Sequence, residues 1–90
     1  MGMPRQSLPQ NEAEERVRIG ATIRELREAR HVGLDELARI VDISRPYLSN
    51  IEAGRKPLTP PLLGRIAHAL DVRPISIVRP NYFPAEPVSA

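Results

Sequence analysis

Apolar residues recur through the middle of the chain at intervals of three and four, which is the period of an amphipathic helix. In a first helix, expected over residues 12–30, the apolar face comprises Val17, Gly20, Ile23, Leu26 and Ala29. In a short second helix, expected after Gly33, it comprises Leu34, Leu37, Ala38 and Val41. Apolar and polar residues nowhere alternate over a stretch long enough for a strand, so the pattern predicts an all-α fold.

Residues typical of helix ends divide the pattern into separate helices. Asn11, followed by Glu14, has the form of a helix start, and His31 is expected in the left-handed conformation that stops this first helix. Asp42 opens a turn after the second helix. Ser44 is a good N-cap for a third helix, which we expect to end at a left-handed glycine, Gly54.

The third helix directs Leu48 and Ile51 inward, and proline is tolerated in its first turn because it removes only a donor without an intrahelical acceptor. Thr59 is expected to cap a fourth helix, whose inward residues are Leu63, Ile66, Ala67 and Leu70. A last short helix is expected over residues 74–78. Residues 11–78 then form one small domain, flanked by flexible, proline-bearing arms over residues 1–10 and 79–90.

Composition excludes several classes of site. The chain of 90 residues contains no cysteine, and His31 and His68 are too far apart for a pair of ligands on one helix, so we expect no metal and no cofactor. No nucleophile, base and orienting group occur together, so an enzyme is a poor hypothesis. No small-molecule site is evident. No apolar run is long enough to span a membrane and no signal peptide is recognisable, which favours a cytoplasmic, nucleoid-associated protein.

Charge is distributed unevenly along the chain. Residues 1–42 carry seven Arg against eight acidic residues, whereas residues 43–80 carry five Arg and one Lys against only Glu52 and Asp71. This local excess could attract a polyanion, although an ordinary solvated surface explains the charge alone equally well.

The order of these motifs gives information about function that the charge distribution does not. Two short helices joined by a turn, the second starting at Ser and ending at Gly, have the geometry of a helix-turn-helix unit. The segments IRELREAR, DELA and ISRPYLSNIEAGRKP, in this order within residues 19–78, resemble the phage repressor and Cro family, also called XRE-like regulators. The resemblance implies a compact five-helix bundle containing a helix-turn-helix, with the third helix in the DNA major groove. The chain departs from the family at Gly33-Leu34, where Ser/Thr-Gln is usual, at Asp42 and at Gly64.

The resemblance also implies which residues touch double-stranded DNA. The candidates for base contacts are the outward residues of the third helix: Arg45, Pro46, Ser49 and Asn50. Arg45 suits guanine and Asn50 suits adenine, while Pro46 offers an apolar surface to a thymine methyl group. The candidates for backbone contacts are Gly33, Leu34, Ser44, Tyr47, Arg55 and Lys56. The alternative for both sets is a solvated surface, and for Tyr47 it is packing against the core.

Two further predictions concern assembly. Spacing puts Arg27 and Glu52 at the edges of the first and third helices that face each other, and the resemblance implies that these two residues join, so we expect a structural ion pair. The alternative is two unlinked surface charges. A domain of this size is only marginally stable, so we expect a homodimer, with Ile75, Ile77 and Val78 as a guess for its interface.

These expectations lead to a sequence-specific transcriptional regulator that binds a palindromic operator as a homodimer. The alternative is an antitoxin or co-regulator whose main partner is another protein, bound through the tail that holds Tyr82 and Phe83.

Overall fold

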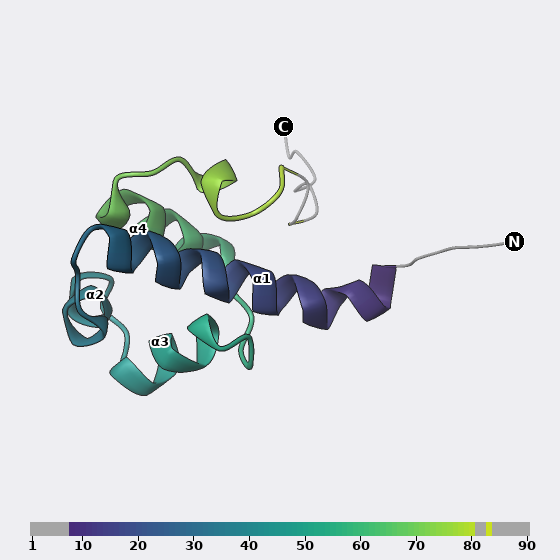
Figure 1. The fold of residues 1–90 in the computed structure, drawn as a ribbon, viewed down its shortest axis with the longest axis horizontal. Coiled ribbons are helices and arrows are strands. Elements are labelled where there is room, and N and C mark those ends of the chain that lie inside the picture. Colours follow the sequence, from purple (N-terminus) through teal and green to yellow (C-terminus); the bar gives the residue numbers. More distant parts are fainter. Residues whose placement is uncertain (1–7, 81–82, 84–90) are drawn as a thin grey trace, which may run out of the picture.

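The computed structural model describes residues 8–80 and Phe83. Four α-helices follow one another: α1 (Leu8–Ala29), α2 (Leu34–Ile40), α3 (Arg45–Glu52) and α4 (Pro60–Leu70), and one 3₁₀ turn, η1 (Pro74–Ser76), comes after them. As Figure 1 shows, α1 runs through the middle of the molecule, with α3 on one side and α4 and η1 on the other. The described part of the chain is all-helical, as predicted.

The expected fifth helix is the 3₁₀ turn η1, so the described structure has four α-helices rather than five. Its hydrogen bonds are those of a single turn, with Ile77 N–H and Val78 N–H both donating to the carbonyl of Pro74, at 2.9 and 3.0 Å. Proline at its first position fixes where the turn begins, and no backbone N–H of the described residues after Val78 bonds back into it.

The first helix begins at Leu8, earlier than the predicted start after Asn11. Pro9 therefore lies in its first turn, where the missing N–H lacks an intrahelical acceptor in any case. Residues 8–10, which the sequence analysis assigned to the arm, thus belong to α1, whereas residues 1–7 lie outside the described residues.

The buried face of α1 also differs from the prediction. The buried residues are Ile19, Gly20, Ile23 and Arg27, whereas Val17 and Ala29, at the two ends of the predicted face, are exposed. The predicted residues were spaced strictly by three, which lags behind the helical repeat by about 60° at each step. A face drawn in that way drifts around the helix, so only its central part meets the core.

Every α-helix of the described structure ends in a left-handed residue. These residues are His31, Asp42, Gly54 and Asp71, with φ of 58°, 63°, 80° and 58°. The N–H of the next residue then donates to a carbonyl five positions back, as from Arg55 to Asn50 at 2.9 Å. This is the Schellman motif, which satisfies carbonyls that the helix leaves without a partner. The expected stops at His31, Asp42 and Gly54 are confirmed, and Asp71 is an additional one.

The two predicted N-caps are present. The Ser44 hydroxyl oxygen accepts a hydrogen bond from Tyr47 N–H at 3.1 Å, and the Thr59 hydroxyl oxygen accepts one from Leu62 N–H at 3.4 Å. Proline follows each cap at the start of its helix. The cap and the proline together fix where α3 and α4 begin.

The core lies where α1, α3 and α4 meet, and α2 closes one end. The side chains of Ile23, Leu37, Leu48, Ile66 and Leu70 have no exposed surface. Gly64, the departure from the family pattern in α4, leaves no void, because a Cβ at this position would point into open space.

The last described residues fold back over α1 and α4. Ile77 and Val78 fill the chain's own core, with 0 and 6% of their surface exposed, so they cannot also anchor a dimer. The sequence-based guess is corrected at these two positions and leaves Ile75, which is 56% exposed. Phe83 packs against the same core.

Glu15 joins this returning segment to α1. Its carboxylate accepts hydrogen bonds from Arg18 at 2.7 Å and from Arg79 at 3.1 Å. The bond from Arg18, with a smaller contribution from Arg79, holds the pKa of Glu15 below its usual value. As the pH falls, the Glu15 carboxylate therefore takes up a proton at a higher pH in the unfolded chain than in the folded protein.

We predict that Glu15→Gln makes the free energy of unfolding less dependent on pH in the acid range. The contribution of Glu15 is fully present above its unfolded pKa, near 4.5, and is lost as the pH falls through the lower folded pKa. Urea unfolding at pH 7 and pH 3 should give a smaller loss of free energy for the variant than for the parent. Glu12→Gln, which alters an exposed carboxylate of the same helix, should behave like the parent.

Candidate nucleic-acid interface

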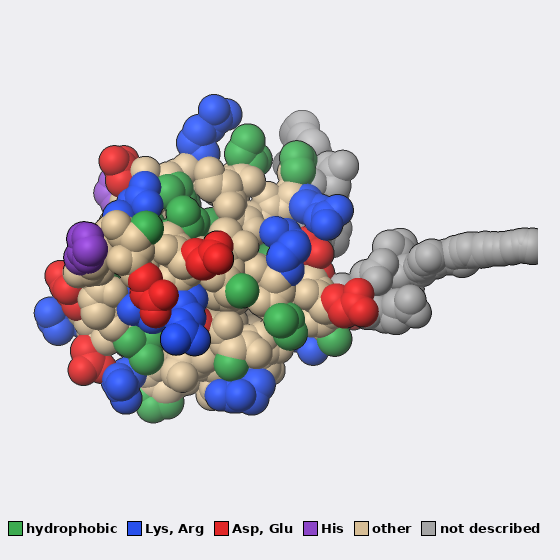
Figure 2. Space-filling model, in the orientation of Figure 1, with side chains coloured by type: hydrophobic (Ala, Val, Ile, Leu, Met, Phe, Trp, Pro, Cys, Tyr) green, Lys and Arg blue, Asp and Glu red, His purple; other side chains and the backbone are tan. Residues whose placement is uncertain are grey.

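Helix α3 has one buried face and one open face. Leu48 and Ile51 are buried in the core, as predicted, with 0 and 1% of their surface exposed. On the other side Arg45 and Pro46 are exposed, whereas the next two base-contact candidates, Ser49 and Asn50, are half-buried. In Figure 2, Lys and Arg side chains lie along the lower edge of the molecule, where α3 is, as well as over the rest of the visible face. The candidates for base contacts therefore share one outward surface.

Arg45 is held by a residue from the preceding helix. Its Nε lies 2.6 Å from Oδ1 of Asp35, in the first turn of α2, and both side chains are largely exposed. The ion pair has its shortest contact at Nε, and because the side chain is largely exposed, the terminal amino groups can still make an end-on contact with a base. Sequence analysis missed Asp35, because no helical spacing links it to Arg45 and only the turn between the helices brings them together.

Asn50 is held in a similar way from the other end of α3. Arg55 Nε–H donates to Oδ1 of Asn50 at 2.9 Å, and the backbone N–H groups of Arg55 and Lys56 both donate to the Asn50 carbonyl, at 2.9 and 3.3 Å. The two cations of the loop after α3 are exposed. Their backbone is therefore fixed on the last turn of α3, and the guanidinium of Arg55 is turned toward Asn50.

The loop is clamped further by α1. Gly54 is left-handed, and a Cβ there would lie 2.7 Å from a methyl carbon of Val17. Arg16 Nε–H donates to the Gly54 carbonyl at 3.3 Å. Only glycine fits at this position, both for its φ and for the space available.

The start of α2 is a less open place for a phosphate. A carboxylate oxygen of Glu36 accepts from Gly33 N–H at 3.4 Å, and Asp35 adds a second negative charge in the same turn. Leu34 packs against the core. A capping box has two bonds, one from each residue's backbone N–H to the other's side chain. Only the bond from Gly33 N–H to Glu36 can form here, because glycine has no side chain to act as the second acceptor.

The remaining backbone candidates lie at the start of α3. Ser44 is exposed, but its hydroxyl oxygen already accepts from Tyr47 N–H as the helix cap. The Tyr47 ring is partly buried and packs against the core, in line with the packing alternative.

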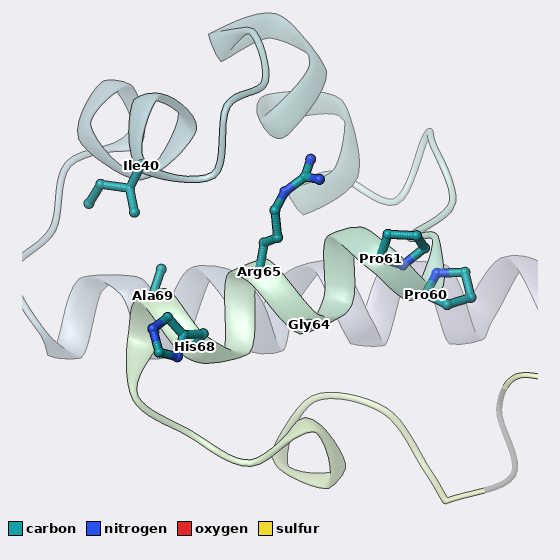
Figure 3. A pocket seen from close by; sticks show the side chains of 7 residues that line it. All are labelled: Ile40, Pro60, Pro61, Gly64, Arg65, His68 and Ala69. Atoms are coloured by element: carbon teal, nitrogen blue, oxygen red, sulfur yellow. The ribbon is translucent and has the colours of Figure 1, made fainter.

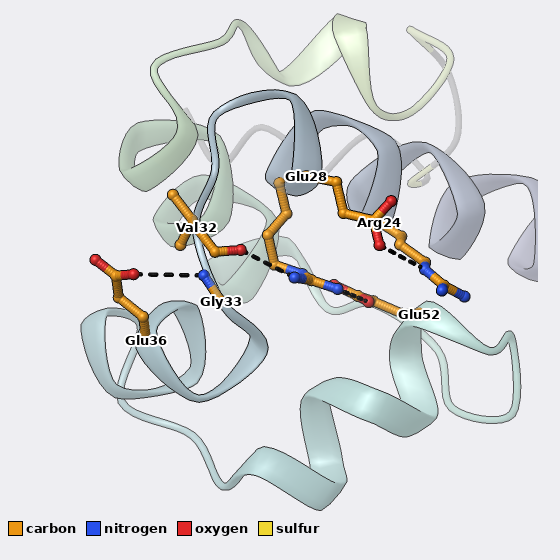
Figure 4. A network of polar contacts seen from close by, with 7 residues as sticks. Arg24, Glu28, Val32, Gly33, Glu36 and Glu52 are labelled. Carbon is orange, nitrogen blue, oxygen red and sulfur yellow. Dashed lines mark hydrogen bonds and ion pairs between the residues drawn. The ribbon is translucent and has the colours of Figure 1, made fainter.

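The predicted pair between Arg27 and Glu52 is present and bidentate. Arg27 Nε lies 2.7 Å from one carboxylate oxygen of Glu52, and a terminal amino group of Arg27 lies 3.0 Å from the other. A third N–H of the guanidinium donates to the Val32 carbonyl at 2.9 Å (Figure 4). Only 10 and 7% of the Arg27 and Glu52 side chains are exposed, and the bond to Glu52 raises the pKa of Arg27. The pair joins α1 to the end of α3 and to the loop before α2.

A shallow hollow lies between α2 and α4 (Figure 3), lined by Ile40, Pro60, Pro61, Gly64, Arg65, His68 and Ala69. Arg65 crosses it, and its Nε–H donates to the Val41 carbonyl at 3.0 Å. Within the described residues, no group of three or more acidic, His or Cys side chains could hold a metal ion. No helix in that part of the chain is long and apolar enough to cross a membrane.

Comparison with known families identifies this arrangement. Residues 18–75, well over half of the chain, match the model of a family described as "Helix-turn-helix domain". The chain belongs to the XRE-like helix-turn-helix family. In this family's terms, α2, the turn at Asp42 and α3 form the helix-turn-helix, and α3 is its recognition helix.

Two curated relatives are similar in sequence. An HTH-type transcriptional regulator of Mycobacterium tuberculosis is 43% identical over 53 residues, which cover 59% of this chain and 38% of the relative. The ImmF control region 10 kDa protein of Bacillus phage phi105 is 40% identical over 50 residues, 56% of each chain. The matched segment thus spans only about two fifths to just over half the length of these relatives.

Three solved structures share the helix-turn-helix fold. The clp gene regulator ClgR from Corynebacterium glutamicum has a TM-score of 0.69 and 36% identity, over 70% of this chain and 67% of that one. The restriction-modification controller protein C.AhdI from Aeromonas hydrophila has a TM-score of 0.69 and 28% identity, over 71% and 97%. A chain of the SinR protein/SinI protein complex has a TM-score of 0.65 and 26% identity, over 71% and 63%.

We predict that Glu52→Ala lowers the free energy of unfolding by about 3 kcal/mol, because it leaves the Arg27 guanidinium buried without its counter-charge. Adding Arg27→Ala should recover part of this loss. A double-mutant cycle on urea unfolding measures the coupling between the two residues.

The exposed pair between Arg24 and Glu28, on the same helix, is the matched control. Arg24 Nε lies 3.1 Å from a carboxylate oxygen of Glu28, but the two side chains are 63 and 54% exposed. Its coupling should stay well under ~1 kcal/mol. Equal coupling in the two cycles would contradict a special role for the buried pair.

Proposed function

We propose that this protein is a sequence-specific DNA-binding transcriptional regulator of the XRE type, from a bacterium or a phage, which inserts α3 into the major groove. The observation that carries the proposal is the outer face of α3, where Arg45, Pro46, Ser49 and Asn50 lie together above a buried apolar face. The names of relatives in a bacterium and a phage support the regulatory role. Such a regulator acts on DNA in the cytoplasm.

The proposed contacts fall into two classes. Arg45, through its terminal amino groups, and its neighbours on α3 read base edges. Arg55 and Lys56 lie in the loop after α3 and supply positive charge to phosphates, which adds affinity without sequence information. Phosphate contacts at Gly33 and Leu34 are weaker candidates, because the two carboxylates at the start of α2 would repel a phosphate.

We also propose that the regulator binds a palindromic operator as a homodimer. Two identical recognition helices related by a two-fold axis read the same sequence in opposite orientation. Ile75, at the end of the chain's helical part, remains the apolar candidate for the dimer surface.

The alternative role, in which the tail binds another protein, is not adopted. It rested on two aromatic residues, and one of them, Phe83, packs against the chain's own core. The other, Tyr82, lies outside the described residues.

Selection from random duplex DNA at near-physiological salt tests the proposal directly, and we expect a shared palindromic motif.

On that motif Arg45→Ala should weaken binding by about 1 to 3 kcal/mol and relax preference at one base pair of each half-site. Lys56→Ala should weaken all sequences alike and reduce the salt dependence of binding by about one phosphate contact. Identical specificity and salt profiles for the two variants would contradict the division into base and backbone contacts.

We predict a dimer whose half-sites lie about one helical turn, ~34 Å, apart. Analytical ultracentrifugation with a full operator should give two chains per duplex, and Ile75→Glu should reduce this to one. Ile40→Glu is the matched control, since Ile40 and Ile75 are 55 and 56% exposed. A monomer both free and on the full operator would refute the dimer, and equal effects of the two variants would refute Ile75 as its anchor.

A further inference from the structure

The carboxamide of Asn50 has a donor end and an acceptor end, and the structure determines which one Arg55 occupies. Arg55 Nε–H donates to Oδ1 at 2.9 Å. A guanidinium contains donors only, so it binds the oxygen end of a carboxamide and not the amino end. The orientation of the Asn50 side chain therefore depends on a residue of the loop that follows α3.

The backbone places Arg55 for this bond. Gly54, with φ of 80°, turns the chain so that the N–H groups of Arg55 and Lys56 both point to the Asn50 carbonyl. The bond from Arg16 to the Gly54 carbonyl and the contact of Gly54 with Val17 fix the turn against α1. Because the backbone is already held, forming the side-chain bond orders only the side chains of Arg55 and Asn50.

The amino end of the carboxamide is left open. Nδ2 of Asn50 has no hydrogen-bond acceptor among the described residues, and it is not one of their buried atoms that lack a partner. Asn50 itself is half-buried on the outer side of α3. The group presented outward is therefore an N–H donor.

We propose that Arg55 is a positioning residue that makes Asn50 read DNA as a donor, at the acceptor edge of guanine. This inference rests on the proposed function. Guanine presents two neighbouring acceptors, N7 and O6, in the major groove. Adenine presents an acceptor and a donor, and a bidentate contact to it needs the carboxamide oxygen as an acceptor, one of whose two lone pairs already accepts from the Arg55 guanidinium. The proposal therefore favours guanine over adenine, the base that the sequence analysis assigned to Asn50.

The test compares Arg55→Met with Lys56→Met in the full chain. Both variants remove one positive charge from the same loop, but within the described structure only the side chain of Arg55 bonds to the Asn50 side chain. Asn50→Ala first identifies the base pair that Asn50 reads in a selection from random duplex DNA. At that base pair the parent and Lys56→Met should both prefer guanine. Arg55→Met should shift the affinity ratio toward adenine by about tenfold, since a freed carboxamide suits adenine. In the Asn50→Ala background, Arg55→Met should shift nothing.

A second measurement does not depend on DNA. In the free protein, Arg55→Met should displace the NMR signals of the Asn50 side-chain amide, whereas Lys56→Met should leave them in place. Thermal unfolding of both variants should match the parent, because both side chains are exposed. Unchanged amide signals in Arg55→Met would overturn the proposal.

The DNA-binding results distinguish a failure of this inference from a failure of the proposed function. If Arg55→Met and Lys56→Met give the same base preferences, Arg55 is only a phosphate contact and the proposal is overturned. A parent that prefers adenine at this base pair overturns it as well. If the parent selects no shared motif, the proposed function fails, and this inference fails with it.

Discussion

The close crossing of α1 and α3 is the contact on which the outer surface depends. At its centre is Gly20, where a Cβ would lie 2.5 Å from the carbonyl oxygen of Glu52, so the two helices meet backbone to backbone. The buried pair between Arg27 and Glu52 fixes the same crossing by charge, and Arg16 and Val17 hold the glycine that ends α3. Helix α3 has eight residues, too few to be stable in isolation. Its position is therefore imposed by α1.

Because α1 holds α3 in place, the side chains of α3 extend from fixed backbone positions. Neighbours outside the helix orient two of these side chains. Asp35 of α2 holds Arg45, and Arg55 of the following loop holds Asn50. Exposed contacts of this kind contribute little to the free energy of folding. They restrict which donor and acceptor groups face outward, so in the proposed function they act on specificity more than on stability.

The arginines of this chain serve two different purposes, which a charge count does not distinguish. Arg65 donates to the backbone carbonyl of Val41, just after α2, and Arg79 pairs with Glu15. Both belong to the basic second half of the sequence, yet their Nε–H groups bind within the protein. The cations beside the recognition helix are Arg45, Arg55 and Lys56, and two of these three also contact a neighbouring side chain. The charge relevant to DNA is therefore smaller and more localised than the sequence suggests.

The sequence by itself determined the features that depend on a few consecutive residues. The caps at Ser44 and Thr59 and the stops at His31, Asp42 and Gly54 were predictable, because capping and left-handed φ are set by local sterics and local hydrogen bonds. Helical spacing also gave the outward face of α3. Even the pair of Arg27 and Glu52 was accessible, since each residue adjoins an apolar residue that must face the partner helix.

Only the tertiary structure decided which residues meet across longer distances. It set the buried face of α1, placed Ile77 and Val78 in the core, and joined Asp35 to Arg45 and Arg55 to Asn50. Periodicity gives the direction of a side chain around its own helix axis, but it does not give the angle at which two helices cross or the path of the loop between them. Those depend on the packing of the whole core, and here on a glycine that lets two helices approach where any side chain would separate them.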